Sequence, residues 1–236
     1  MDFLLSRTYK FLVVFFVILI TLLNNSLAQD DIDEYYYFGL EAGVSSPVVK
    51  VFKDTENDSS FRLGSSTMFG FRAGYSFYPG MMIELSATHQ PSYGFKYDIL
   101  KTIVEDDFSG STKTRTDVAM INIIYALQNE YYGFKPYFTA GAGIAKVTIK
   151  PSKGSFLGEA LVFKVEKNNI NCLTYQFGFG ATKELTKNIA LDLSLKLQII
   201  KDIEFKYNSF DIISKIKKSP AAGEFALGLI YKIPVK

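Results

Sequence analysis

Ile189 to Ile199 read IALDLSLKLQI, a segment in which apolar side chains alternate strictly with polar ones. The polar positions are Asp192, Ser194, Lys196 and Gln198. Successive side chains of a β-strand point to opposite faces, so this segment predicts a strand with one apolar and one polar face. The same period of two recurs along most of the chain, and helical spacing is absent from the sequence after residue 29.

Eight segments of 13 to 16 residues follow this pattern. They are Tyr35 to Pro47, Ser66 to Tyr78, Met82 to Tyr97, Thr114 to Ala126, Phe134 to Ile149, Cys172 to Leu185, Ile189 to Ile203 and Gly223 to Val235. Strands of soluble proteins typically have about five or six residues, whereas a tilted strand needs about 9 to 11 to cross the hydrocarbon of a bilayer. The lengths therefore favour strands that span a membrane.

The connections between these segments alternate between short and long. The short ones are 79–81, 127–133 and 186–188, and the long ones are 48–65, 98–113, 150–171 and 204–222. Short turns at one end and long loops at the other are typical of outer-membrane barrels, whose turns face the periplasm. An even number of strands then places both ends of the barrel on the periplasmic side.

Within each strand, alternate residues point to opposite faces, and we call these two sets the two parities. One parity holds the aromatic residues and leucines, and the other holds polar or small residues. Nine glycines share the polar parity: Gly39, Gly43, Gly70, Gly74, Gly141, Gly143, Gly178, Gly180 and Gly228. A soluble barrel or sandwich would bury the apolar set and leave glycine without a preferred side. An eight-stranded membrane barrel instead has a crowded interior that favours small inward residues. We therefore predict an all-β fold, an eight-stranded antiparallel up-and-down transmembrane β-barrel.

The polar parity also carries charged residues, which would lie inside the barrel. They are Glu41, Arg72, Glu84, Asp192, Lys196 and Glu224. Isolated buried charges are too costly, so we expect a linked hydrogen-bonded network that also blocks wide aqueous flow. Tyr78, Tyr125, Tyr137 and Tyr231 lie at strand ends, where we expect phenol rings at the lipid–water interface. The alternative for these tyrosines is a place in a soluble core.

The N-terminal segment has the features of an export signal. Arg7 and Lys10 precede the apolar run Phe11 to Leu23, which is too short to cross a bilayer, and small residues follow up to Ala28. The alternative is a short membrane anchor that stays attached. The predicted organisation is a signal peptide at 1–28, a short periplasmic segment at 29–34 and an outer-membrane β-barrel with four long extracellular loops at 35–236.

Composition excludes several classes of function. The formal charge of +2 provides no global basic field for nucleic acid. Cys172 is the single cysteine and His89 the single histidine, so neither a disulfide nor a Cys/His zinc cluster is available. We expect no metal, no cofactor and no nucleic-acid partner.

Three segments resemble a known family. Lys135 to Ala145 resembles the fifth strand of the opacity and OmpA-like outer-membrane barrels, Gly70 to Tyr75 their second strand and Gly223 to Tyr231 their closing strand. The chain is most similar to the small adhesin-like branch of that family. The resemblance implies a bacterial outer-membrane location and a surface-binding role. Two departures are the segment Lys232 to Lys236 after the last aromatic residue and the lack of a following peptidoglycan-binding domain.

The third and fourth long connections, loop three (150–171) and loop four (204–222), are each more basic than acidic, which favours an anionic partner. The candidate binding residues are Lys150, Lys153, Lys164, Lys167, Lys206, Lys215, Lys217 and Lys218. The partner would be a host-surface or serum protein, a glycan or lipopolysaccharide phosphate, beside the membrane lipid around a monomeric barrel. The alternative is that these lysines are ordinary solvated charges. Loop four also contains apolar residues that would extend the wall or form a contact patch: Phe205, Tyr207, Phe210, Ile212 and Ile213.

Three other functions stay open at this stage: a structural envelope protein, a narrow pore and a lipid A-modifying enzyme. His89 is the sole candidate catalytic base, near the outer rim on the lipid side. Ser86 and Ser92 have the opposite parity, so they do not supply a nucleophile within the roughly 3 Å that a working pair requires. We therefore expect an adhesive or otherwise binding surface barrel that is not an enzyme.

Overall fold

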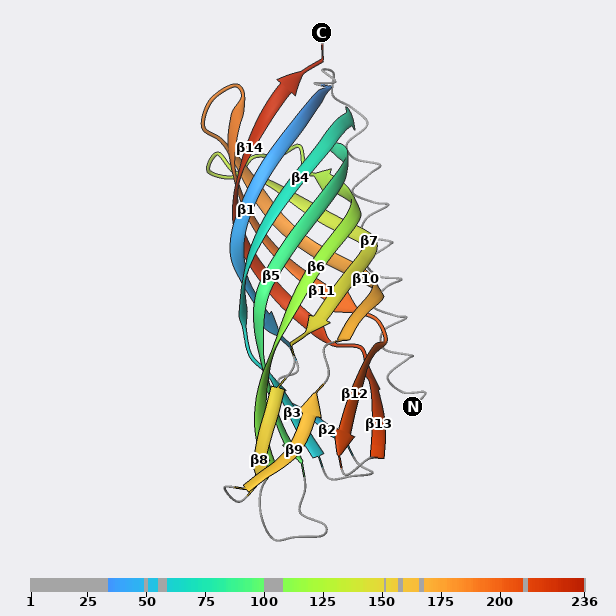
Figure 1. Cartoon of the computed structure of the whole chain (residues 1–236). Helices are drawn as coiled ribbons and strands as arrows, with labels where there is room; N and C mark the ends of the chain where they lie inside the picture. Colours follow the sequence, from blue (N-terminus) through green and yellow to red (C-terminus); the bar gives the residue numbers. More distant parts are fainter. Residues whose placement is uncertain are drawn as a thin grey trace, which may run out of the picture.

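The computed structural model describes residues 34–48, 51–54, 59–99, 108–150, 152–156, 159–165, 168–209 and 212–235. Eight antiparallel strands close into a barrel, which Figure 1 shows from the side. They are β1 (Tyr35–Pro47), β4 (Ser66–Tyr78), β5 (Met81–Ile99), β6 (Phe108–Ala126), β7 (Lys135–Ile149), β10 (Asn168–Glu184), β11 (Ile189–Ile200) and β14 (Ala221–Pro234). Within these residues, no helix is long and apolar enough to cross a membrane.

The order around the barrel is β5-β4-β1-β14-β11-β10-β7-β6, and pairing of β6 with β5 closes it. The first and last strands pair along their whole length, from Tyr35 opposite Pro234 to Pro47 opposite Ala222. Closure pairs both edges of each of the eight barrel strands, which a chain in hydrocarbon requires because lipid offers no hydrogen-bond partners. The predicted fold class is confirmed, and each of the eight predicted strands corresponds to one barrel strand, although several bounds differ.

The long connections contain additional strands. These are β2 (Val51–Asp54), β3 (Ser59–Leu63), β8 (Ser152–Phe156), β9 (Glu159–Val165), β12 (Ile203–Ser209) and β13 (Ile212–Lys218). Beyond the barrel, β5 and β6 stay paired as far as Ile99 opposite Phe108, and the β2–β3 hairpin adds to β5. These regions are therefore largely hairpins, which project from the barrel end opposite the C-terminus in Figure 1.

The predicted seventh strand is too long at its outer end. Ile189 to Ile203 is expected as one strand, but β11 ends at Ile200 and β12 begins at Ile203. Asp202 between them has a φ of 59°. A residue in this left-handed region cannot continue a strand, so the chain turns there and β12 enters a separate four-stranded sheet of order β13-β12-β9-β8.

The barrel wall is apolar outside and polar inside. Phe177, Leu195 and Leu229 are exposed on the outer surface, whereas Gln176, Lys196 and Gly228 occupy the intervening inward positions. Several inward positions are glycine, because the interior leaves little room for further side chains there. A Cβ added at Gly43 would lie 2.0 Å from the backbone oxygen of Phe225.

Candidate functional site

The largest charged cluster inside the barrel is centred on Arg72 of β4. Nη2 of Arg72 lies 2.6 Å from Oδ2 of Asp192, and its Nη1 lies 3.9 Å from Oε2 of Glu84. Asn122 donates a hydrogen bond of 3.0 Å to Oε1 of Glu84, and Gln176 donates one of 2.9 Å to Oδ1 of Asn122. These contacts join β4, β5, β6, β10 and β11 across the barrel, so one guanidinium compensates two buried carboxylates.

Two inward tyrosines extend this cluster towards the short turns. Tyr37 donates to Glu84 at 3.0 Å, and Tyr137 donates to Asp192 at 2.9 Å. Each ring occupies space left by a glycine on the neighbouring strand, since a Cβ at Gly74 would lie 2.3 Å from the Tyr37 ring and one at Gly180 would lie 2.4 Å from the Tyr137 ring. Glycine and tyrosine are register partners in both cases.

The expected interfacial belt of tyrosines is therefore only partly right. Tyr78 and Tyr231 are exposed, but Tyr125 and Tyr137 are both buried. Tyr137 shares the inward parity of Thr139 and Gly141 on β7, and its hydroxyl has a carboxylate partner inside the barrel. For Tyr137 parity decides the side, whereas Tyr125 is buried although it has the outward parity of Ile121 and Ile123. The sequence interpretation also missed Tyr37, although its parity contains that signal.

The remaining inward charges form separate contacts nearer the long hairpins. Lys196 donates to both carboxylate oxygens of Glu41, at 3.1 and 3.0 Å. Glu224 accepts a hydrogen bond of 2.6 Å from Gln90. All six charged residues of the proposed interior network are at most 5% exposed. The structure thus brings Arg72, Glu84 and Asp192 into one cluster and places the other three in adjoining contacts.

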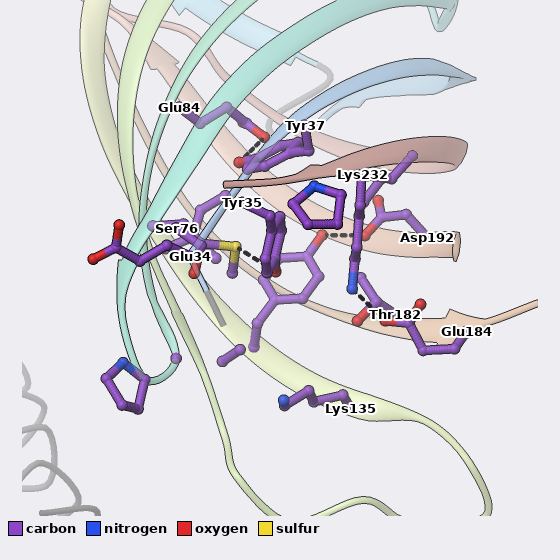
Figure 2. A pocket seen from close by; sticks show the side chains of 18 of the residues that line it. Glu34, Tyr35, Tyr37, Ser76, Glu84, Lys135, Thr182, Glu184, Asp192 and Lys232 are labelled. Atoms are coloured by element: carbon purple, nitrogen blue, oxygen red, sulfur yellow. Dashed lines mark hydrogen bonds and ion pairs between the residues drawn. The ribbon is translucent and has the colours of Figure 1, made fainter. Parts of the chain in front are cut away.

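A cavity of about 970 Å³ lies at the end of the barrel that carries the short turns, and Figure 2 shows its lining. Arg72, Glu84 and Asp192 contribute to its wall on the barrel side. Near its mouth, Lys232 pairs with Glu184 and lies over the Tyr35 ring. The lining is mixed in charge and includes aromatic and aliphatic groups, so it carries no single chemical signature of a ligand.

The predicted lysines lie at the opposite end. Lys153, Lys164, Lys206 and Lys215 fall within β8, β9, β12 and β13 respectively, and Lys217 and Lys218 also lie in β13. Lys150 follows β7 and is exposed. Lys167 lies outside the described residues, as do the predicted signal peptide at 1–28 and most of the segment 29–34.

Backbone pairing places several of these lysines opposite one another. Lys153 is the register partner of Lys164, and Lys206 is the register partner of Lys215. Asn208 opposite Lys164 connects the two hairpins, so the basic segments of loops three and four belong to one sheet. The side chains of the apolar residues predicted as a patch in loop four lie outside the described residues.

His89 lies at the outer edge of the apolar wall. Its Nδ1 is 2.6 Å from Oδ1 of Asp117, and Arg115 donates through Nε to Oδ2 of Asp117 at 2.9 Å. Ser86, considered above as a nucleophile, instead accepts a hydrogen bond from the interior Asn122 at 2.9 Å. Among the described residues, no group of three or more His, Cys, Asp or Glu side chains could hold a metal ion.

Comparison with known proteins identifies relatives of the whole barrel. The family model of the outer membrane protein beta-barrel domain matches residues 15–232. Uncharacterized protein RP788 of Rickettsia prowazekii (strain Madrid E) is 30% identical over 181 residues, covering 71% of this chain and 99% of that protein.

The solved structure of one outer membrane protein shows the same fold at low sequence identity. Outer membrane protein OprG from Pseudomonas aeruginosa is 16% identical with a TM-score of 0.57, and the match covers 86% of this chain and 97% of OprG. Neisserial surface protein A is also 16% identical and has a TM-score of 0.49. That match covers 84% of this chain and 97% of Neisserial surface protein A.

Proposed function

Because this chain belongs to the outer membrane protein β-barrel family and lies in the bacterial outer membrane, we propose that its extracellular hairpins bind anionic molecules of the host surface or the envelope. Short turns of such barrels face the periplasm, so the four-stranded sheet β13-β12-β9-β8 projects from the cell. The partner class is a sulfated or phosphorylated glycan or an acidic protein. The protein acts as a binding surface without catalysis.

The observation that carries this proposal is the pairing of lysine with lysine. Like charges directly opposite one another destabilise an antiparallel sheet. Lys153 opposite Lys164 and Lys206 opposite Lys215 repeat this arrangement in two hairpins of one sheet. A bound anion offsets the repulsion at both pairs, which provides a physical reason to keep four cations in that register.

The test uses folded protein in neutral phosphatidylcholine vesicles and measures binding to immobilised heparin, as a sulfated glycan, and to host cells. The variant Lys153→Gln/Lys164→Gln/Lys206→Gln/Lys215→Gln removes the paired cations. We expect it to lose at least tenfold in heparin affinity at low ionic strength, with little change in heat-modifiable gel migration. The matched control, Lys183→Gln/Lys187→Gln, removes charge at the short-turn end and should bind as the parent does.

The outcomes separate adhesion from a structural role in the envelope. Equal binding of the parent, the quadruple variant and empty vesicles contradicts the proposal and favours a barrel that only shields and stiffens the membrane. Binding that survives in the quadruple variant places the binding surface elsewhere on the protein.

A further inference from the structure

We propose a second binding site, on the outer wall of β5, β6 and β7, for the phosphate of an outer-leaflet lipid headgroup. The site consists of Arg115, Lys146 and the His89–Asp117 pair, with Lys113 and Lys150 beyond them. It differs from the hairpin lysines because it lies on the barrel wall itself.

The wall is asymmetric where its apolar band ends. On β1, β4 and β14 the next outward residues past the apolar series are Ser46, Thr67 and Gly223, which carry no charge. On β5, β6 and β7 the corresponding residues are charged or titratable. His89 is opposite Asp117, and Asp117 is opposite Lys146, so the three form one cross-strand row.

Further cations lie two or more residues beyond this row on the same outward face. Arg115 lies two residues beyond Asp117 on the same face, and its side chain is half exposed. The backbone of Lys150 donates to the carbonyl of Lys113 at 3.0 Å, so the residue after the end of β7 lies beside Lys113 of β6. Among the described side chains on this face of β5, β6 and β7, Lys113, Arg115 and Lys146 lie near one carboxylate, Asp117, so this part of the wall is positively charged.

Asp117 orients the cationic groups. Its two oxygens contact different partners, Nδ1 of His89 and Nε of Arg115, so the carboxylate links β5 to a residue further out on β6. Because Asp117 engages Arg115 through Nε, the two terminal nitrogens that match phosphate geometry are not the atoms bound to the carboxylate. A fixed guanidinium loses less entropy when it binds an anion than a free one does.

The position of the row indicates a lipid rather than a soluble anion. The outward residues next to this row on its membrane side are Ala87, Ala119 and Ile144, all of them apolar. An amphipathic ligand would place acyl chains on this apolar band and its phosphate at the row. Basic residues at this depth are attracted to anionic headgroups, and the attraction falls off within a Debye length.

The test measures binding of lipid A, which carries phosphate, to the folded full chain in a neutral detergent by native mass spectrometry. Dephosphorylated lipid A serves as the matched probe. We expect the parent to prefer the phosphorylated form, and Arg115→Gln/Lys146→Gln to reduce that affinity about thirty-fold at low ionic strength, as expected for two basic residues near an anionic surface. Lys183→Gln/Lys187→Gln should leave the affinity unchanged.

A further variant separates orientation from simple charge. Asp117→Asn makes the patch more positive, so purely electrostatic attraction would increase lipid A affinity. Orientation of Arg115 and His89 by the carboxylate instead predicts a decrease of several fold, with normal heat-modifiable migration. Equal binding of the two lipid forms by the parent, or unchanged binding in Arg115→Gln/Lys146→Gln, overturns the site. Binding of heparin at this patch without lipid A binding overturns the assignment to a lipid.

Discussion

Leu40 and Glu41 are neighbours in β1, yet the first is 67% exposed and the second 5%. The same contrast between the two faces of the wall recurs around the barrel, and it reverses the arrangement of a soluble protein. Outside, the surrounding lipid accepts Leu40 without penalty. Inside, Glu41 is tolerated because Lys196 supplies both a compensating charge and two hydrogen bonds. The comparison teaches that each face is stabilised by a different partner, lipid on one side and protein on the other.

The largest expected effect comes from adding volume to the inner face. A Cβ at Gly143 would lie 2.0 Å from the backbone oxygen of Ala119, and a strand backbone cannot move away without breaking the pairing of β6 with β7. We expect Gly143→Val to cost about 4–5 kcal/mol or more and to prevent folding. The measurement is heat-modifiable gel migration after refolding into vesicles.

The matched control for this variant is Ala142→Val, which adds volume on the lipid side of the same strand. It should fold as the parent does. If both variants fold equally well, interior crowding does not explain why the inward positions are glycine.

The second prediction removes one partner of a buried ion pair. Lys196→Met leaves the Glu41 carboxylate without its cation in the barrel interior, which should lower the free energy of unfolding by about 3–5 kcal/mol. Guanidinium unfolding in vesicles measures the change. The double variant Glu41→Gln/Lys196→Met should recover most of the loss. Equal destabilisation by the single and double variants would contradict the pairing.

The third prediction introduces a charge on the outer face. Leu40 lies near the middle of the outward row on β1, so Leu40→Arg should cost about 2–4 kcal/mol. Val48→Arg, just beyond the end of the same strand, should cost about 0–1 kcal/mol because charge is tolerated near the interface. Unfolding of both variants in the same vesicles provides the measurement. Similar costs at the two positions would contradict the expectation that the cost of an outward charge depends on its depth in the membrane.

The smallest expected effect concerns a single hydroxyl group. Tyr137→Phe removes the hydrogen bond to Asp192 and should cost about 1.5–3 kcal/mol, the range for a bond to a charged group. Tyr175→Phe removes an outward hydroxyl from β10 and should change the unfolding free energy by less than about 0.5 kcal/mol. The difference between the two variants, measured by equilibrium unfolding, tests whether the hydrogen bond from Tyr137 to Asp192 stabilises the barrel interior.

Much of the fold could be predicted because local patterns reflect it directly. The alternation at Ile189 to Ile199 predicts both the strand and its two faces, and β1 and β4 have the bounds that the sequence predicts. The break at Asp202 could not be predicted in this way, because nothing in the alternation excludes a strand that continues to Ile203. Turn conformation depends on contacts that period two does not record.

The candidate sites were predictable only in part. Parity identifies the inward charges, but it does not say that Arg72 contacts Asp192, a residue on a strand that is distant both in sequence and around the barrel. The row of His89, Asp117 and Lys146 likewise depends on the register of three strands. Asp117 and Lys146 have no distinguishing feature in the linear sequence, His89 stands out there only as a candidate base, and the row forms only once the strands are paired.

The sequence by itself determined that eight amphipathic strands cross the membrane and which side chains face lipid, because side-chain direction alternates with a period of two within each strand. Only the tertiary structure decided which charges meet, which glycines make room for Tyr37 and Tyr137, and that the basic segments of loops three and four join in one sheet. The physical reason is that register and closure are long-range hydrogen-bond choices. A one-residue shift between strands would leave the alternation within each strand unchanged and break all of these contacts.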